Sequence, residues 1–265
     1  MKVLAVIPAR YASTRFPGKP LALLAGKPII QWVWEHVACC GVGDNTGASV
    51  ITEAMVATDD QRIVEAVRQF GGKAMMTSSQ HRSGTDRCGE VLRNLEAQGC
   101  YYDVVVNVQG DEPFVQQSQL ASLVGCFADA STQIATLKTA ISSQQELLSP
   151  NNVKVVCGKE DRAIYFSRQP IPYLRGVDQG EWLERQPYFK HVGIYAFRSE
   201  VLKKVVELQP SPLEMSESLE QLRWLENDYR IQVRTTQQAN IGIDTPEDLA
   251  AAEQFLLNKK KKYTL

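Results

Sequence analysis

Short apolar runs alternate with helical patterns along the first half of the chain. The run from Val3 to Ile7 ends at Pro8, which is typical of a buried parallel strand. The later apolar segments repeat this order of strand and helix. They predict a helix around 29–37, a connection at 41–49, a strand at 55–58, a helix at 63–70, a strand at 73–76, a helix at 91–95 and a strand at 104–108. This order predicts an α/β fold, a mainly parallel twisted sheet with helices on both faces.

The pattern becomes less regular after residue 131. Two apolar segments, 152–157 and 163–167, flank Gly158 to Asp161 and predict a hairpin. The remaining elements that we expect are a strand at 191–197, a helix at 213–225, a strand at 231–235 and a closing helix at 246–257, followed by a frayed, solvated tail at Lys259 to Lys262. We interpret 1–265 as a single domain with three portions, 1–130, 131–230 and 231–265.

Length and charge exclude several classes of protein. A chain of 265 residues buries enough surface to fold without disulfides or a structural metal. Its 29 basic and 30 acidic residues leave a net charge of -1, which argues against a protein that binds nucleic acid through a general basic field. The six cysteines form no C-x-x-C motif and are expected to be buried thiols; they are Cys39, Cys40, Cys88, Cys100, Cys126 and Cys157.

The N-terminal segment has no signal-peptide pattern. It runs directly into the strand at residues 3–7, without a basic region and a small-residue cleavage site. No stretch approaches the roughly 18 apolar residues of a membrane span. We therefore expect a cytoplasmic protein without membrane insertion.

The loop after the first predicted strand carries uncompensated positive charge. Residues 1–34 contain five cations, Lys2, Arg10, Arg15, Lys19 and Lys27, and no Asp or Glu. Pro8, Pro17 and Pro20 stiffen this loop, which favours a positional task over a merely solvated surface. In a chain that is neutral overall, these cations predict a phosphate site at the end of a strand.

Two carboxylates follow other predicted strands. Asp111 comes directly after the apolar strand at 104–108, and Asp244 precedes the closing helix. Thr245, Pro246 and Asp248 already account for the start of that helix as N-cap, first residue and capping box. Ligands of open parallel sheets bind at the carboxyl ends of strands, where two aspartates facing a polyphosphate could hold Mg²⁺. A simple turn role remains the alternative for both.

Other catalytic motifs are missing from the sequence. It contains no Walker A loop, no complete dinucleotide fingerprint and no G-x-S-x-G nucleophile elbow. His36, His81 and His191 are isolated in the sequence, which gives no support to a histidine metal site. Kinase, dehydrogenase and covalent hydrolase functions are therefore disfavoured.

Segments spread over nearly the whole chain carry a family resemblance. They are IPARYASTRFPGKPL, SGTDR, VNVQGDEP, NNVKVV, YFSR, KHVGIYAF, QPSPLE, LEQLR and IDTPEDL. Together they resemble the 3-deoxy-manno-octulosonate (Kdo) cytidylyltransferases, also called CMP-Kdo synthetases. The resemblance implies a GT-A-like nucleotidyltransferase fold and a homodimer that makes CMP-Kdo and pyrophosphate from CTP and Kdo with Mg²⁺, for lipopolysaccharide biosynthesis.

The resemblance also implies roles for individual residues. Asp111 and Asp244 would hold the metal, and Arg10 and Lys19 would act on the triphosphate. The nucleotide site would be completed by Ser13, Arg15 and the Ser83, Gly84 and Thr85 segment, in a CTP-binding portion at 1–130. The acid sugar would contact Gln109, Arg168, His191, Tyr195, Glu220 and Gln221, with sugar binding and dimerisation in 131–230 and the second metal ligand in 231–265.

Three alternatives stay open from the residues. The first is a cytidylyltransferase for another 2-keto acid sugar, of the amino-Kdo or sialic acid type. The second is a GT-A glycosyltransferase, although the sequence lacks the Asp-x-Asp motif that such enzymes normally carry. The third is a non-catalytic nucleotide-binding regulator, which the presence of both aspartates and all the loop cations disfavours.

Overall fold

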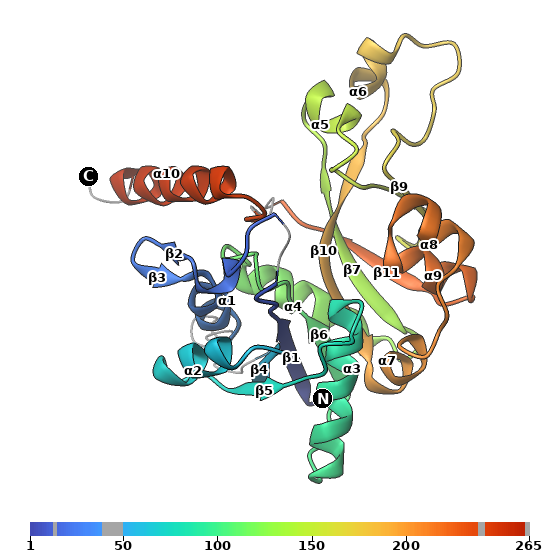
Figure 1. Cartoon of the computed structure of the whole chain (residues 1–265). Helices are drawn as coiled ribbons and strands as arrows, with labels where there is room; N and C mark the ends of the chain where they lie inside the picture. Colours follow the sequence, from blue (N-terminus) through green and yellow to red (C-terminus); the bar gives the residue numbers. More distant parts are fainter. Residues whose placement is uncertain (13–14, 39–49, 238–241, 263–265) are drawn as a thin grey trace. The chain divides into compact units, whose positions relative to one another are not determined.

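Two compact units make up the computed structural model of the chain (Figure 1). The structure describes residues 1–12, 15–38, 50–237 and 242–262, with side chains up to residue 258. The first unit comprises 1–120 together with 240–265, and the second comprises 121–239. The chain thus changes unit at 120/121 and 239/240, whereas the portions expected from the sequence meet at 130/131 and 230/231. The predicted connection at 41–49 lies outside the described residues.

The first unit is built on a parallel sheet. Its strands are β1 (Val3–Pro8), β4 (Glu53–Thr58), β5 (Ala74–Met76) and β6 (Val104–Asn107), in the order β6-β1-β4-β5. Ala5 of β1 lies opposite Ala54 of β4 on one side and Val106 of β6 on the other. The side chains from Val3 to Ile7 are almost completely buried, as expected for a strand that is covered on both faces.

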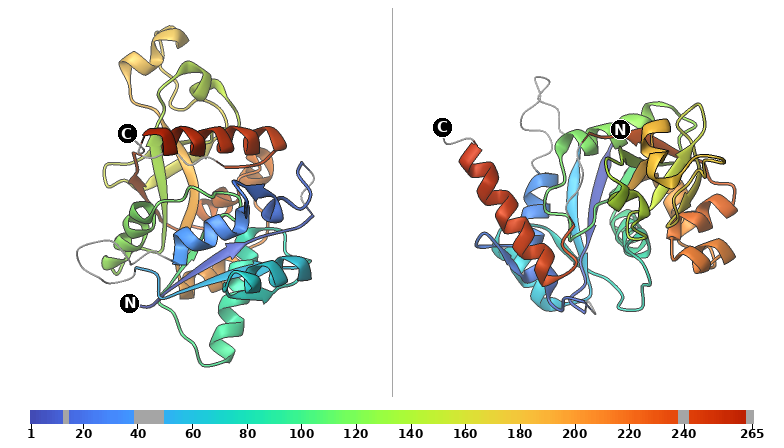
Figure 2. Two further views of the ribbon diagram at one scale, coloured as in Figure 1. Left: turned by 90° about the vertical axis from the view of Figure 1, so that its left-hand side faces the viewer. Right: turned by 90° about the horizontal axis from the view of Figure 1, so that it is seen from above.

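Helices cover both faces of this sheet, as the alternating pattern predicts. Figure 2 shows α1 (Ile29–Ala38) and α2 (Gln61–Gln69) on one face and α3 (Gly84–Ala97) on the other. This arrangement follows from right-handed crossovers, because the chain moves outward from β1 to β4 and β5 and then returns to β6. The carboxyl ends of the strands therefore meet at one edge.

The return segment at 242–262 completes the first unit. Its helix α10 (Pro246–Lys262) packs on a cluster with Leu24, Ile29 and Phe114, beside the two-stranded hairpin β2 (Leu23–Leu24) and β3 (Lys27–Pro28). The expected frayed tail at Lys259 to Lys262 is wrong for the backbone, which stays helical to Lys262. Lysine is a good helix former, and no Gly or Pro interrupts the run. The helix α4 (Gln117–Gly125) begins in this unit and ends in the next.

The second unit contains the mixed part of the structure. Its strands are β7 (Ile134–Ala140), β8 (Lys154–Cys157), β9 (Ala163–Ser167), β10 (Phe189–Arg198) and β11 (Ile231–Thr235). β7 lies between β10, to which it is antiparallel, and β11, to which it is parallel. The predicted hairpin is confirmed as β8 and β9, which pair antiparallel. The helices are α5 (Gln144–Leu148), α6 (Trp182–Arg185), α7 (Ser199–Val205), α8 (Pro212–Glu217) and α9 (Glu220–Glu226).

The single helix predicted at 213–225 is wrong, because the structure has α8 and α9 in its place. Between them, Ser218 adopts a left-handed backbone conformation with a φ of 52°, which ends α8. Arg168 donates from Nε to the Glu217 carbonyl over 2.6 Å and from Nη2 to the Ser218 carbonyl over 3.3 Å. The break is thus stabilised by a side chain 50 residues earlier in the chain, which helical periodicity does not show.

Aromatic rings fill the core between β10 and α9. Trp224 is fully buried and makes edge contacts with Tyr195 and Phe197, with centroids 4.9 and 5.1 Å apart. His191 joins this cluster 5.1 Å from the Tyr195 ring, and its Nε2 lies 2.9 Å from Thr136 Oγ1. Burial lowers the pKa of His191 to about 3, so this imidazole stays neutral at physiological pH.

The four cysteines of the described residues differ in their exposure. Cys88 and Cys126 are buried, Cys157 is partly buried and Cys100 is exposed, so the expectation of a buried thiol is wrong for Cys100. Cys100 follows Gly99 in the turn after α3, where the backbone has left the core. Cys39 and Cys40 lie outside the described residues.

Over the described ranges, no helix is long and apolar enough to cross a membrane.

Acid should destabilise the fold through His191. Between pH 6.5 and about 3 the unfolded chain binds a proton at this imidazole that the folded chain does not bind, so the free energy of unfolding falls as the pH falls. For one proton the slope reaches about 1.4 kcal/mol per pH unit. We expect His191→Gln to lose less stability than the unmodified chain between pH 7.5 and 5, in urea unfolding followed by fluorescence. Parallel pH profiles would contradict a buried neutral His191.

Candidate active site

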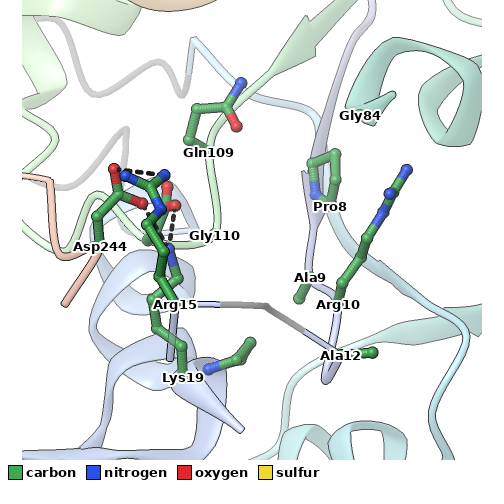
Figure 3. A pocket seen from close by; sticks show the side chains of 12 residues that line it. Pro8, Ala9, Arg10, Ala12, Arg15, Lys19, Gly84, Gln109, Gly110 and Asp244 are labelled. Atoms are coloured by element: carbon green, nitrogen blue, oxygen red, sulfur yellow. Dashed lines mark hydrogen bonds and ion pairs between the residues drawn. The ribbon is translucent and has the colours of Figure 1, made fainter. Parts of the chain in front are cut away.

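A pocket of about 280 Å³ opens at the carboxyl ends of the strands of the first unit (Figure 3). The end of β1 and Arg10 line one side, and residues 109–111, which follow β6, line the other together with Arg15 and Lys19 of the first loop. Gly84 and Asp244 complete the wall. The structure thus brings together the three strand-end regions that the sequence singles out.

Two carboxylates in this pocket converge on one ammonium group. Lys19 Nζ lies 2.6 Å from Asp111 Oδ2 and 3.1 Å from Asp244 Oδ1. The Lys19 side chain is only 10% exposed, while those of Asp111 and Asp244 are 31% and 47% exposed. A largely buried cation therefore faces two anions that solvent and ligands can still reach.

Backbone contacts hold the two aspartates at the same place. The N–H of Ile243 donates to the Asp111 carbonyl over 2.9 Å, which ties the return segment to the loop after β6. The predicted capping box is confirmed, since Asp248 N donates to Thr245 Oγ1 and Thr245 N donates to Asp248 Oδ2. Asp244 itself takes no part as a capping side chain, so its carboxylate is available to the pocket.

Gly110 allows the loop after β6 to approach β1. A Cβ atom at position 110 would lie 2.6 Å from the carbonyl oxygen of Pro8, which is far inside van der Waals contact. The neighbour is main chain in the central strand, so it cannot move aside as a flexible side chain would. Glycine at this position therefore brings Asp111 close to the phosphate loop. The turn signal at 109–113 shows in the sequence, but this close approach does not.

Arg10 lies across the pocket, held by the segment before α3. Its Nη2 donates to the carbonyl of His81 over 2.6 Å. Burial, followed by the neighbouring positive charge of Arg87, lowers the pKa of Arg10, although an arginine remains charged in either case. Arg87 is itself buried and donates to Asp59 Oδ2 and Thr77 Oγ1, both over 2.7 Å. The sequence assigns no role to Asp59, and Arg87 enters it only as the last residue of the SGTDR segment. The charge of Arg87 adds to the positive potential beside Arg10, and the charge of Asp59 offsets part of it.

The rest of the first loop is fixed by a stacked pair. The guanidinium carbon of Arg62 lies 3.4 Å from the centroid of the Tyr11 ring, which also packs on Gly18. Gly18 has a φ of 72°, a conformation that favours glycine, and it leads directly into Lys19. Arg15 is 67% exposed and reaches Asp244 Oδ2 over 3.1 Å. Ser13 lies outside the described residues.

The predicted base-binding segment forms the start of α3. Ser83 caps this helix, since its Oγ accepts from Asp86 N over 3.1 Å while Asp86 Oδ2 accepts from Ser83 N over 3.0 Å. Gly84 packs near the Pro8 ring, where a Cβ atom would come within 3.2 Å of Pro8 Cγ. Thr85 is buried. The amino end of a 14-residue helix thus borders the pocket and adds partial positive charge to it.

Most of the predicted sugar residues lie in the second unit. His191 and Tyr195 lie beside each other on β10, and the Glu220 carboxylate is close enough to raise the pKa of Tyr195 further, after burial. Gln221 is buried next to Glu220 on α9. The hydroxyl of Tyr195 is buried and has no hydrogen-bond partner among the described residues. His191, Tyr195 and Glu220 thus lie close together and Gln221 is next to Glu220 in the chain, whereas Gln109 belongs to the first unit and lines the pocket there.

Arg168, at the end of β9, makes several contacts to the main chain. Besides the two carbonyls at the break between α8 and α9, its Nη1 donates to the Pro150 carbonyl over 3.0 Å. Its backbone N–H donates to Glu217 Oε2 over 2.9 Å. The guanidinium therefore donates to three main-chain carbonyls. Arg168 stabilises the end of α8 whether or not it also contacts a sugar.

Comparisons with known proteins agree with this arrangement. A family model described as "Cytidylyltransferase" matches residues 4–235. The 3-deoxy-manno-octulosonate cytidylyltransferase of Parabacteroides distasonis is 52% identical over 263 residues, which cover 98% of this chain and all of the relative. That of Geobacter metallireducens is 47% identical over 255 residues, covering 94% of this chain and 95% of the relative.

One solved structure supports the same family, and a more distant one shares only the fold. A CMP:2-keto-3-deoxy-manno-octonic acid synthetase complexed with CTP is 41% identical and superposes with a TM-score of 0.86, covering 98% of this chain and all of that one. A 4-diphosphocytidyl-2C-methyl-D-erythritol synthase from Anaerococcus prevotii is 14% identical, with a TM-score of 0.58 over 97% of this chain and 98% of its own, and shares the fold alone. On these full-length matches, the chain belongs to the 3-deoxy-manno-octulosonate cytidylyltransferase family.

Proposed function

We propose that this chain transfers CMP from CTP to the anomeric hydroxyl of Kdo, with release of pyrophosphate. The observation that carries the proposal is the convergence of Asp111, Asp244 and Lys19 in a pocket at the strand ends. The full-length relatives named for this reaction support the choice of substrates. As the sugar oxygen attacks the α-phosphorus and gives up its proton, negative charge develops on the leaving pyrophosphate, which a cationic pocket stabilises.

The positive side chains of the pocket suit a triphosphate. Lys19 supplies a compact point charge and Arg10 a planar fork that can grip two oxygens. Arg15 lies at the rim, where an exposed cation can attract and orient the incoming anion. The amino end of α3, with Ser83, Gly84 and Thr85, offers backbone groups to the cytosine edge, and Ser13 completes the set that the resemblance implies. These residues bind and orient CTP before the sugar oxygen attacks its α-phosphorus.

The donor set also fits Mg²⁺, which we propose as the cofactor. The carboxylates of Asp111 and Asp244 both contact the ammonium group of Lys19, so they can meet at one cation. Carboxylate oxygens are also ligands that Mg²⁺ prefers. Asp111 and Asp244 would hold the ion, which when bound would neutralise charge on the reacting phosphate oxygens. Lys19 then has its charge available for phosphate.

The aromatic cluster of the second unit suits the acid sugar. Tyr195 offers an unpartnered hydroxyl, and Glu220 and Gln221 offer polar groups on the adjoining helix. His191 is neutral, so it can bond a sugar hydroxyl without a charge. Gln109, on the wall of the CTP pocket, and Arg168, at the end of β9, complete the set that the resemblance implies.

The remaining parts of the proposal concern the setting of the reaction. The chain is proposed to work in the cytoplasm as a homodimer, on small-molecule substrates and without nucleic acid or membrane insertion. CMP-Kdo would then serve lipopolysaccharide biosynthesis. The main competing activity is transfer of CMP to another 2-keto acid sugar of the amino-Kdo or sialic acid type, since contacts to one hydroxyl decide between such substrates.

Pyrophosphate release tests the function directly. We expect release from CTP, and far less from ATP, GTP or UTP, only when Kdo and a divalent cation are both present. Parallel reactions with sialic acid and without sugar separate the competing activities. Equal turnover of sialic acid would overturn Kdo as the substrate, and release without any sugar would point to a hydrolase.

The metal site makes a second prediction. Asp111→Asn and Asp244→Asn keep the shape of the side chain but remove its charge, so kcat should fall by roughly 100-fold or more in each. Excess EDTA should abolish turnover of the unmodified chain, and added Mg²⁺ should restore it. The measurement is the initial rate of pyrophosphate release over a range of Mg²⁺ concentrations.

Asp228→Asn is the matched control for these two variants. Asp228 is exposed in a left-handed turn, which asparagine also tolerates, so its kcat should be unchanged. A near-normal kcat in Asp111→Asn or Asp244→Asn would leave that aspartate with a turn-forming role only.

Tyr195→Phe tests the sugar cluster. The hydroxyl has no partner to lose among the described residues, so the free energy of unfolding should change by less than about 0.5 kcal/mol. If the hydroxyl bonds Kdo, KM for Kdo should rise about 2- to 10-fold while KM for CTP stays constant. Tyr188→Phe is the opposite control: it loses the 2.7 Å bond to the Pro172 carbonyl and some stability, but should keep its KM for Kdo. An unchanged KM for Kdo in Tyr195→Phe would remove Tyr195 from the sugar site.

A further inference from the structure

Arg10 depends on a single backbone oxygen outside its own loop. Its Nη2 donates to the His81 carbonyl over 2.6 Å, and its other donors have no partner among the described residues. The side chain lines the CTP pocket at the same time (Figure 3). One terminal nitrogen thus anchors the guanidinium, and the remaining donors are left to meet an anion.

The oxygen that anchors Arg10 lies in the segment from Thr77 to Ser83, between β5 and α3. Both ends of the segment are fixed by their own contacts. Thr77 donates from N to the Thr58 carbonyl over 2.8 Å. At the other end, Arg82 N and Ser83 N donate to Asp86 Oδ2 over 3.1 and 3.0 Å.

Glu90 of α3 holds the middle of this segment. Its Oε2 accepts from the backbone N–H of Ser78 over 2.9 Å and is in close contact with His81 Nε2. Burial opposes the charged form, but the bonds from Ser78 and His81 outweigh it, and the pKa of Glu90 is lowered. One carboxylate oxygen therefore gathers two donors, and the second donor belongs to the residue whose carbonyl receives Arg10.

We propose that Glu90 is a positioning residue for the triphosphate site, which acts through the backbone of His81 to hold the Arg10 guanidinium in place for CTP. The inference rests on the proposed function, because it takes Arg10 as a ligand of the triphosphate. Glu90 lies two turns inside α3, and neither the strand-end pattern nor the segments that carry the family resemblance include it.

Two further features favour this role over a purely structural one. The Glu90 and His81 side chains are 24% and 18% exposed, so their contact adds little to the hydrophobic core. The bonds also form a chain, in which Glu90 of α3 contacts the His81 imidazole and the His81 carbonyl accepts from Arg10 in the pocket. An arginine that is already ordered loses less conformational freedom when it binds phosphate, which improves affinity.

The test is a double-mutant cycle on CTP binding. Calorimetric titration with CTP and Mg²⁺, without sugar, should show an affinity about 3- to 10-fold weaker for Glu90→Gln than for the unmodified chain. Glu65→Gln, which changes an exposed carboxylate of α2 bonded to Gln61, is the matched control and should bind CTP normally. In an Arg10→Ala background, Glu90→Gln should cause no additional loss.

The outcomes separate the possible roles of Glu90. If Glu90→Gln weakens binding equally with and without Arg10, Glu90 supports the fold and does not act through Arg10, and the inference fails. The inference also fails if Glu90→Gln binds CTP as tightly as the unmodified chain. If the unmodified chain itself does not bind CTP, the proposed function fails first. With CTP saturating, kcat of Glu90→Gln should stay within about threefold of normal, whereas a general loss of folding would lower it further.

Discussion

Two carboxylates that share one ammonium organise the pocket of the first unit. Lys19 is nearly buried, and a buried cation is costly unless its partners stay in place. Its partners come from the loop after β6 and from the return segment, so the ion pairs require these two loops to meet. A bound triphosphate would pair with the same lysine, and a bound divalent cation would pair with the same two carboxylates. Assembly of the fold and the proposed chemistry of the site would therefore depend on one set of atoms.

Close main-chain packing makes this meeting possible. Gly110 brings the loop after β6 against Pro8 at a distance that any side chain would prevent. The bond from Ile243 N to the Asp111 carbonyl then adds the return segment to that pair. On the opposite wall, Arg10 is anchored by a carbonyl rather than a carboxylate, so it keeps its charge available to a ligand. On one side of the pocket the charges of Lys19 and the aspartates are paired, and on the other side Arg10 is bonded only to a neutral carbonyl.

Local sequence patterns predict much of this architecture. The alternation of apolar runs with helical periodicity predicts the parallel sheet of the first unit, and Thr245 with Asp248 predicts the start of α10 at Pro246. The family resemblance, carried by whole segments, predicts the family that the full-length relatives confirm. These features rest on residues near one another in the chain or on whole recognisable segments, and so the order of amino acids is enough to show them.

What escapes prediction depends on contacts between distant residues. The break at Ser218 is stabilised by Arg168, and no window around α8 contains that arginine. The sequence leaves Asp244 without a structural duty because its partner, Lys19, lies 225 positions away. Glu90 looks like an ordinary member of an amphipathic helix, and its contacts show only when the segment before α3 lies beside it. Hydrophobic periodicity predicts which face of a helix is buried, but it does not predict which residues of other elements contact that face.

The chain leaves the first unit at residue 120 and returns to it only after residue 239. During synthesis on a ribosome, Lys19 and Asp111 therefore emerge well before Asp244. At 5–20 residues per second the delay is on the order of 10 s, long enough for the second unit to begin folding. A nascent chain can bring β1 beside β6 in that time, but its pocket has one carboxylate and no tie from Ile243. Premature termination anywhere in the second unit thus yields a product whose pocket lacks Asp244, so the return segment, which is made after the second unit, completes the ion pairs of a lysine that is made near the start.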